Sequence, residues 1–314
     1  MKKTAIVILS LIVTNVLCAQ ESKNVYNFMR LPVSAHAAAV GGDNISLIED
    51  DETLIFHNPA LLASVSDKNI NLNYLHYILD ANMISAAFNK TINNQASTAI
   101  SAQYINYGTM KQTSAENIVL GEFSAKDIAI AGYFSYMLSN CWMGGISTKM
   151  ITSYIGGYNS LAMGVDIGLN YYNPQSELSV SLVAKNLGGQ LKAYNEEYES
   201  MPADVQVGFS KHLVHTPFRF HVTAVDLNHW NYKFINHLVS GIDLSLSKQI
   251  WVGIGYNFRR AHEMSIRSGE VESSHSAGFS CGAGINLQRI KFNLAYGKYH
   301  LSSSALLINA SFEL

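Results

Sequence analysis

The stretch LAMGVDIGLNY, residues 161–171, decides the fold of this chain. Its first, third and later odd positions are apolar or aromatic, while the positions between them are small or polar and include Asp166 and Asn170. A period of two places these groups on opposite faces of a strand, whereas a helix would scatter them around its surface. Alternation over about 9–11 residues is typical of a transmembrane β-strand with one face toward lipid. We therefore predict a membrane-spanning strand whose Asp166 and Asn170 face the lumen of a barrel.

Two later stretches, 250–258 and 277–287, repeat this pattern. Apolar residues alternate there with glycine, serine or asparagine, which places Asn257 and Asn286 on the predicted lumen side. Fourteen strands are predicted in all: 68–79, 81–91, 95–107, 124–139, 141–155, 161–171, 176–188, 203–213, 217–227, 237–248, 250–258, 277–287, 289–301 and 304–314. The predicted fold class is an all-β transmembrane antiparallel β-barrel.

The connections between the predicted strands alternate in length. Long connections follow odd-numbered strands, near 108–123, 189–202, 228–236 and 259–274, and short turns follow even-numbered ones. Bacterial outer-membrane barrels have long extracellular loops and short periplasmic turns. The alternation therefore supports an even number of strands, with both ends of the barrel in the periplasm.

The composition also favours a membrane protein. Charged residues make up 14% of the chain, against about 25% in average soluble domains. Lys and Arg total 21 and Asp and Glu total 23, so no basic field is present to attract nucleic acid. A secreted β-sandwich is the main alternative, but its strands usually run about 5–6 residues, shorter than those predicted. We expect a barrel in the outer membrane of a Gram-negative bacterium, in contact with lipid and not with nucleic acid.

The N-terminus has the features of a secretory signal. Lys2 and Lys3 precede an apolar run over residues 5–17, and Ala19 is a plausible cleavage point. We predict three regions: a signal peptide over 1–19 that is removed, an N-terminal plug segment over 20–66, and the barrel over 67–314.

Two matches to catalytic patterns lack the structural setting that catalysis requires. Residues 278–282, GFSCG, match G-x-S-x-G, but they lie within a predicted strand and not at a strand–turn–helix junction. Ser245 and Lys248 match S-x-x-K, yet in a strand they face opposite sides. We therefore expect no enzymatic activity and no cofactor.

Histidines and aromatic residues are expected at loops and membrane interfaces. The histidine spacing does not match a zinc motif, so loop or interfacial positions are favoured over a metal site for His212, His215, His221, His229 and His237. Interfacial girdles are expected to include Tyr74, Tyr77, Trp142, Tyr171, Tyr172, Trp230 and Trp251.

The segment FMRLPVSAHAAAVGGDNISLIEDDETLIFHNPALL, residues 28–62, carries most of the remaining information. Asn58-Pro59 favours a turn, and Gly41-Gly42 permits backbone conformations closed to other residues. The acidic run 49–52 could cap a helix, bind a cation or contact lumen groups, although a solvated acidic turn is the simplest interpretation. Both turn motifs suit a compact plug, and we assign no metal to the acidic run.

This segment resembles the N-terminal signature of the PorV and PorQ proteins of the type IX secretion system, which are themselves similar to FadL-type barrels. Relatives of that kind commonly carry Arg where this chain has His36, and Leu where it has Val40. The plug motif that carries the resemblance comprises Arg30, Leu31, Pro32, Gly41, Gly42, Asp50, Asp51, Asn58, Pro59 and Ala60.

The resemblance implies a non-catalytic secretion component, closer to PorQ than to the longer PorV. Such a protein would hold a PorZ-like surface partner in an attachment complex with a PorU-like sortase and a PorV-like barrel. Its expected docking surface is formed by the loops 109–122, 189–202 and 259–274. The alternatives are a PorV-like carrier of cargo C-terminal signals and a FadL-like transporter of hydrophobic small molecules. Transport would require a continuous apolar path past the plug or a lateral opening at a kinked strand.

Overall fold

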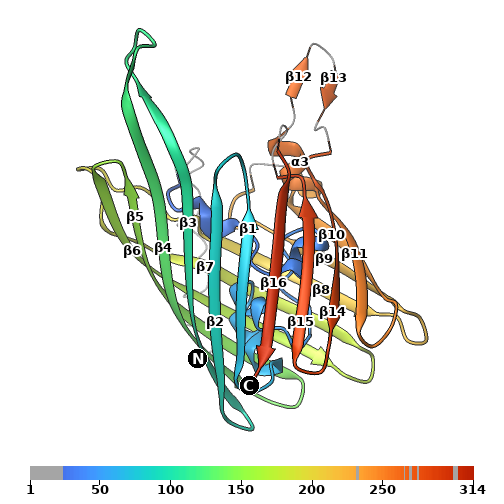
Figure 1. The fold of residues 1–314 in the computed structure, drawn as a ribbon. Coiled ribbons are helices and arrows are strands. Elements are labelled where there is room, and N and C mark those ends of the chain that lie inside the picture. The colour runs from blue at the N-terminus through green and yellow to red at the C-terminus, as the bar shows by residue number, and fades with distance from the viewer. Residues whose placement is uncertain (1–23, 231–232, 265, 269–270, 274–275, 300–302) are drawn as a thin grey trace, which may run out of the picture.

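Fourteen long strands form a closed antiparallel barrel in the computed structural model, which describes residues 24–230, 233–264, 266–268, 271–273, 276–299 and 303–314. The strands are β1 (Asn69–His76), β2 (Asn82–Asn93), β3 (Ala96–Thr113), β4 (Val119–Met137), β5 (Trp142–Ile155), β6 (Tyr158–Asn173), β7 (Leu178–Lys192), β8 (Asp204–His212), β9 (Phe218–Ala224), β10 (Leu238–Ser245), β11 (Ile250–Asn257), β14 (Phe279–Asn286), β15 (Ile290–Gly297) and β16 (Ala305–Glu313). The first strand pairs with the last, from Asn69 opposite Glu313 to His76 opposite Leu306. The predicted barrel of fourteen strands is confirmed (Figure 1). The predicted signal peptide over 1–19 lies outside the described residues.

The alternation of apolar with small or polar residues that predicted the strands also separates their exposed outer face from their buried inner face. In β6, Ile167 is 52% exposed on the outer face, while Asp166 is 1% exposed on the inner face. Large apolar side chains cover the outer surface of many other strands, as Leu72, Ile100 and Leu294 do. Closing the ladder satisfies the backbone groups without water, which is the requirement for a strand in lipid. None of the helices in the described part of the chain is long and apolar enough to cross a membrane.

The connections between strands are short at one end of the barrel and long at the other. Short turns and the C-terminus lie at one end, which we assign to the periplasm, and long connections lie at the other. The predicted loop over 108–123 is instead mostly strand, because β3 and β4 continue as a projecting hairpin (Figure 1). The predicted loop over 259–274 contains α3 (Phe258–Glu263) and a small hairpin of β12 (Ile266–Ser268) and β13 (Val271–Ser273). A further short helix, η4 (Phe234–His237), precedes β10.

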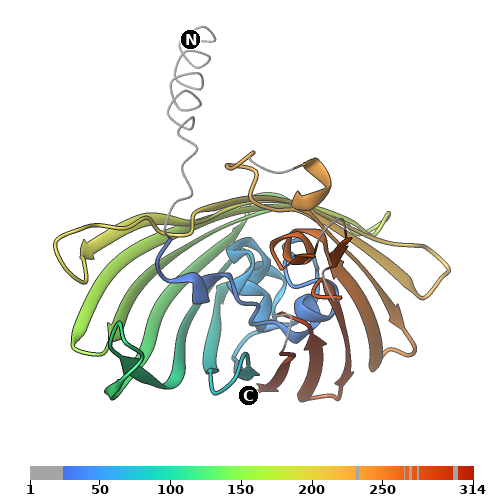
Figure 2. The ribbon, with the colours of Figure 1, turned by 90° about the horizontal axis from the view of Figure 1, so that it is seen from above.

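Residues 24–66, called the luminal segment below, lie inside the ring of strands (Figure 2). The segment begins at the outer end, where Val25 N donates to Ser200 O at 3.0 Å, and ends near the periplasmic start of β1. Its short helices are η1 (Asn27–Arg30), α2 (Ala35–Ala39), η2 (Glu52–Phe56) and η3 (Pro59–Ser64). Most of its residues are buried, including Ile45, Leu54 and Leu61 at 0% exposure.

Side-chain caps explain why these helices begin where they do. Ser34 accepts from Ala37 N at the start of α2, and Asp51 accepts from Thr53 N at the start of η2. Asn58 accepts from Ala60 N at 2.9 Å, and Pro59 occupies the first position of η3. Such caps satisfy amide groups that the helix itself leaves unpaired. The Asn58-Pro59 pair, predicted to form a turn, therefore starts a helix.

Glycines on the inner face of the barrel receive the luminal segment. A Cβ added to Gly145 would be 2.3 Å from Pro59 C, and one added to Gly255 would be 2.1 Å from Val40 C. The small residues at these positions on the lumen side therefore border the backbone of the luminal segment. Glycine is required there because the backbone of the luminal segment touches the wall.

Candidate functional site

A cluster of charged residues joins the luminal segment to the wall in the periplasmic half of the lumen. We call His36, Glu49, Arg219, His221 and Asp243 the latch cluster. Both His36 nitrogens face carboxylates, with Nδ1 at 2.8 Å from Glu49 Oε2 and Nε2 at 3.0 Å from Asp243 Oδ2. Arg219 Nη2 contacts the same two carboxylates, and His221 Nε2 lies 2.8 Å from Asp243 Oδ2. Two residues of the luminal segment and three of the barrel thus share one network.

The two carboxylates keep His36 protonated. Burial alone would lower its pKa, but Glu49 and Asp243 raise that pKa to about 9. Burial acts against ionisation of Glu49 as well, yet His36 and Arg219 lower its pKa to about 2. The His36 ring also stacks on Trp251, with 3.6 Å between ring centroids and 4° between planes. At neutral pH His36 therefore carries a positive charge.

The residues of the acidic run 49–52 have different surroundings, and Glu49 belongs to the latch cluster. Asp50 accepts from Ser66 N at 2.7 Å and forms an ion pair with Lys291 Nζ at 2.6 Å, and these partners lower its pKa against the effect of burial. Asp51 caps η2, and burial raises its pKa. Glu52 is 1% exposed and neither carboxylate oxygen has a hydrogen-bond partner, so burial and the nearby Asp51 raise its pKa to about 8. The expected solvated acidic turn is therefore wrong.

The remaining motif residues lie along the length of the lumen. Arg30 and Leu31 line the outer cavity, and Pro32 is buried below them. Gly41 and Gly42 adopt φ of 120° and 104°, which favours glycine, and Gly41 O accepts from Arg260 Nη2 at 3.0 Å. Ala60 O accepts from a hydroxyl of the wall, Ser135 Oγ, at 3.3 Å. The motif thus fixes the luminal segment to several strands.

The predicted lumen residues have partners of different kinds. Asp166 forms a buried ion pair with Lys149, with 2.6 Å between Oδ2 and Nζ. Asn170 donates to Ser179 Oγ at 2.8 Å. Asn257 caps α3 and donates to Gly41 O, whereas Asn286 is half-buried near the periplasmic end of β14.

Two residues with important contacts, Trp251 and His221, were misplaced by the sequence interpretation. Trp251 is 4% exposed under His36 and does not lie in an interfacial girdle. It shares the inner face of β11 with Gly253, so its place in the alternation was the available signal. His221 is 3% exposed on the inner face of β9, so the expected loop or interfacial position is wrong for it. His237 lies in the connection between β9 and β10, as expected for a loop residue, although it is 0% exposed. Among the described residues, no group of three or more His, Cys, Asp or Glu could hold a metal ion.

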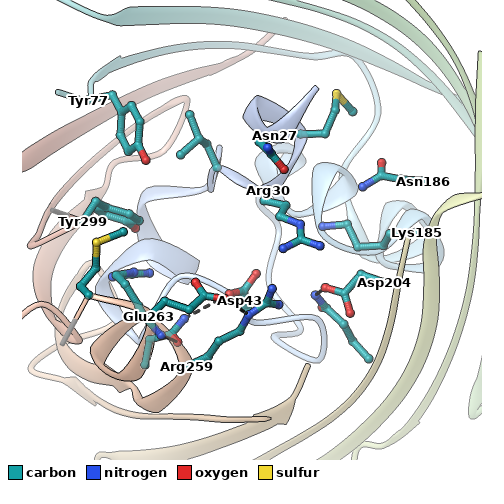
Figure 3. Close-up of a pocket in the computed structure, with 16 residues that line it drawn as sticks. Asn27, Arg30, Asp43, Tyr77, Lys185, Asn186, Asp204, Arg259, Glu263 and Tyr299 are labelled. Carbon is teal, nitrogen blue, oxygen red and sulfur yellow. Dashed lines mark hydrogen bonds and ion pairs between the residues drawn. The ribbon is translucent and has the colours of Figure 1, made fainter. Parts of the chain in front are cut away.

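Three hollows border this arrangement. An outer cavity of about 390 Å³, called the outer vestibule, opens beside η1 and α3 (Figure 3). A periplasmic cavity of about 300 Å³ includes Glu49 and Arg219. The two have no lining residue in common, and the luminal segment contributes to both. A third hollow of about 410 Å³ is lined by apolar side chains of β9, β10, β11 and β14 around Gly241 and Gly255.

Comparisons with known proteins identify the fold. No protein-family model matches the chain. No curated protein matches it either. Among solved structures, the Pseudomonas putida toluene transporter TodX is similar over 90% of this chain and 97% of its own, with a TM-score of 0.54 and 12% identity. The CymD monoaromatic hydrocarbon channel is similar over 93% and 97%, with a TM-score of 0.56 and 14% identity. A Pseudomonas aeruginosa FadL homologue is similar over 94% and 99%, with a TM-score of 0.51 and 10% identity. The fold is that of FadL-like outer-membrane barrels.

Proposed function

We propose that this protein is an outer-membrane channel for small hydrophobic compounds, held closed by its luminal segment. The observation that carries the proposal is the placement of that segment between the outer vestibule and the periplasmic cavity. Toluene and monoaromatic hydrocarbons are the compounds named for two of the structures with this fold. Fold alone does not fix a substrate, so the argument depends on the gate-like position of the segment.

The apolar hollow on the outer surface supports a hydrophobic substrate. Ile242, Ile254 and Phe220 line it, and all three are at least 37% exposed. Its Gly241 and Gly255 are opposite each other in the β10–β11 ladder, and the luminal segment touches both from inside. At this point no wall side chain separates the hollow from the segment. A small apolar molecule in the membrane would therefore come close to the gate here.

The latch cluster supports a segment that is held firmly in place. The segment also contacts β8, where Ser46 Oγ and Ser210 Oγ are 2.7 Å apart. Opening the channel would require such contacts to break together. A covalent link at this position would prevent that movement without filling either cavity.

A disulfide tests the gate directly. Ser46→Cys/Ser210→Cys would be made in a Cys141→Ser/Cys281→Ser background, because the two cysteines in the described part of the chain are free. We expect cells with the reduced variant to take up labelled toluene faster than cells without the protein, and oxidation to abolish the difference. Each single cysteine variant controls for the effect of the oxidant. Equal uptake in the oxidised and reduced states would exclude a moving gate, and uptake no faster than without the protein would exclude toluene transport.

A second candidate function, a type IX secretion component that holds a surface partner, is favoured by one specific feature. The β3–β4 hairpin projects beyond the rest of the barrel and carries exposed Ile118, Val119 and Leu120, which are 61%, 57% and 64% exposed (Figure 1). Exposed apolar side chains in a row are typical of a protein contact. This candidate retains the proposed PorZ-like partner, the PorU-like sortase and the PorV-like barrel, together with the resemblance of the luminal motif.

Crosslinking in the native membrane separates the two functions. An Ile118→Ser/Leu120→Ser variant should lose a crosslinked surface protein while remaining a folded barrel, and deletion of 259–274 tests a second of the three predicted docking loops. Ile92→Ser, exposed at the periplasmic end, is the matched control. An unchanged crosslinking pattern in both variants would argue against the partner-holding function.

A further inference from the structure

Two cations in the outer vestibule form no ion pair with a described residue. The side chain of Lys185, on β7, is 7% exposed and makes no hydrogen bond or ion pair with any described residue. Its charge interacts only at longer range with the carboxylates of Asp43 and Asp166. Arg30, at the end of η1, likewise lacks such a partner, and its Nε is buried without one. Both side chains point into the cavity (Figure 3). A buried positive charge without a partner is costly, so the pair indicates a site for something negative.

The other charges around the cavity are already compensated. Arg259 pairs with Asp226 at 3.2 Å and with Glu263 at 2.8 Å. Asp204 accepts from Gln206 Nε2 at 2.7 Å, so its carboxylate has a donor from the wall. The vestibule therefore combines acids that have close partners with two bases, Arg30 and Lys185, that form no ion pair with a described residue.

The two remaining charged groups of the cavity, Arg260 and Asp43, also have close partners. Arg260 donates to Gly41 O and stacks on the ring of Tyr299 at 3.8 Å. Asp43 Oδ2 accepts from Asn257 Nδ2 at 3.2 Å. None of these groups is positioned by a contact with Arg30 or Lys185.

We propose that the outer vestibule binds a small polar anion, a carboxylate or phosphate that also carries hydroxyl groups, through Arg30 and Lys185. The guanidinium fork suits two oxygens of such a group, and the ammonium supplies a point charge. The acids that line the same cavity, Asp43, Asp204 and Glu263, accept from the ligand's hydroxyl groups (Figure 3). A volume of about 390 Å³ accommodates a molecule of this size.

A long acyl chain does not fit this cavity. Its aliphatic and thioether lining is limited to Met29, Leu31 and Met264, and most other lining residues are charged or amide side chains. Burying an alkyl chain against those groups would remove their hydration without replacing it. The site therefore goes beyond the proposed hydrophobic channel and does not depend on it.

The two cations belong to different parts of the molecule. Arg30 is in the luminal segment, whereas Lys185 is in the wall. A bound anion therefore bridges the segment to the barrel, and ligand binding should raise the thermal stability of the folded protein.

Calorimetric titration of the purified barrel in a nonionic detergent tests the site. Inorganic phosphate and gluconate are the two anionic probes, glucose is the neutral counterpart of gluconate, and decanoate is the acyl probe. We expect saturable binding of at least one polar anion and none of glucose. Arg30→Gln and Lys185→Gln should each weaken that binding at least tenfold, whereas Lys111→Gln on the outer hairpin should leave it unchanged. The tighter of the two polar probes identifies the preferred anionic group.

The proposal is overturned if neither polar anion binds, if decanoate binds more tightly than both, or if the two cavity variants bind like the wild type. Circular dichroism checks that each variant is folded. If a variant fails to fold, the wild type alone still decides: its midpoint of thermal unfolding should rise with gluconate and not with glucose, and an equal effect of both would count against an anion site.

Discussion

Asn58 of the luminal segment lies directly against Gly168 of β6, so that a Cβ added to Gly168 would be 2.0 Å from Asn58 Oδ1. The same side chain donates to Ile45 O at 2.9 Å and accepts from Ala60 N at 2.9 Å. Gly168 is opposite Gly145 in the β5–β6 ladder, and a Cβ on Gly145 would meet Pro59. The Asn58-Pro59 turn and this glycine pair therefore form a complementary contact.

Gly168→Ala should displace the Asn58-Pro59 turn from the wall. The added methyl group meets a side chain held by three hydrogen bonds, so we expect a loss of about 1–3 kcal/mol in the free energy of unfolding. Ion conductance in a planar bilayer should also rise, because the contact that seats the luminal segment is broken. Gly132→Ala is the control, since its Cβ would meet only Thr148 Oγ1 at 4.0 Å. Wild-type stability and conductance in Gly168→Ala would contradict this role.

The strands could be predicted because lipid imposes a period of two on every segment that crosses it. Where that constraint ends, the prediction fails: β3 and β4 remain paired at Met110 and Phe123, beyond the alternating pattern, because hydrogen bonds alone sustain the hairpin. The contacts of the luminal segment were inaccessible for another reason. A glycine such as Gly168 has the same sequence signature whether it borders water or a packed backbone. Only the three-dimensional arrangement separates the two.

The candidate site was predictable in part. The motif 28–62 marked the segment that carries it, and the parity of β6 placed Asp166 correctly on the inner face. The latch cluster was missed because Glu49 contacts Arg219 across 170 positions of the sequence, and His36 contacts Asp243 across 207. Such pairings depend on the register of distant strands, which local patterns do not contain.

His36 should stabilise the protein in a pH-dependent way. Its pKa is raised from 6.5 to about 9 in the folded state, so its contribution is fully present below pH 6.5 and is lost as the pH rises through 9. His36→Gln should remove this alkaline loss and cost about 3–5 kcal/mol at pH 6, because Arg219 alone then faces Glu49 and Asp243 and one buried negative charge is left uncompensated. Thermal unfolding between pH 6 and 10 measures both effects. His36→Arg, with a permanent charge, should keep its stability up to pH 10; a wild type with no alkaline decline would contradict the assigned protonation.

Unlike His36, Glu52 should destabilise the folded state, and it should do so above neutral pH. Its pKa is raised from 4.5 to about 8, so the folded protein holds a proton that the unfolded chain has already lost. Stability should therefore fall as the pH rises from 4.5 to 8. Glu52→Gln should raise the free energy of unfolding at pH 8 by roughly 2–4 kcal/mol. Denaturant titrations at pH 5 and pH 8 check this, with the exposed Glu116→Gln as control; an equal effect of Glu52→Gln at both pH values would refute the buried proton.

The buried pair of Lys149 and Asp166 gives the last prediction. Lys149 Nζ lies 2.6 Å from Asp166 Oδ2 and 2.8 Å from Asn186 Oδ1, and Asp166 Oδ1 accepts from Asn186 N at the bulge in β7. Lys149→Met should cost about 3–5 kcal/mol, because it leaves a buried carboxylate without its counter-ion.

Adding Asp166→Asn to Lys149→Met should recover more than half of that loss. The amide removes the uncompensated charge, and its oxygen still accepts from Asn186 N. A double-mutant cycle by denaturant unfolding measures the coupling, and the exposed Lys90→Met controls for the loss of a lysine at the surface. If the double variant is no more stable than Lys149→Met, the charge on Asp166 is not what makes the single variant unstable, and the position of Asn186 at the bulge becomes the better explanation.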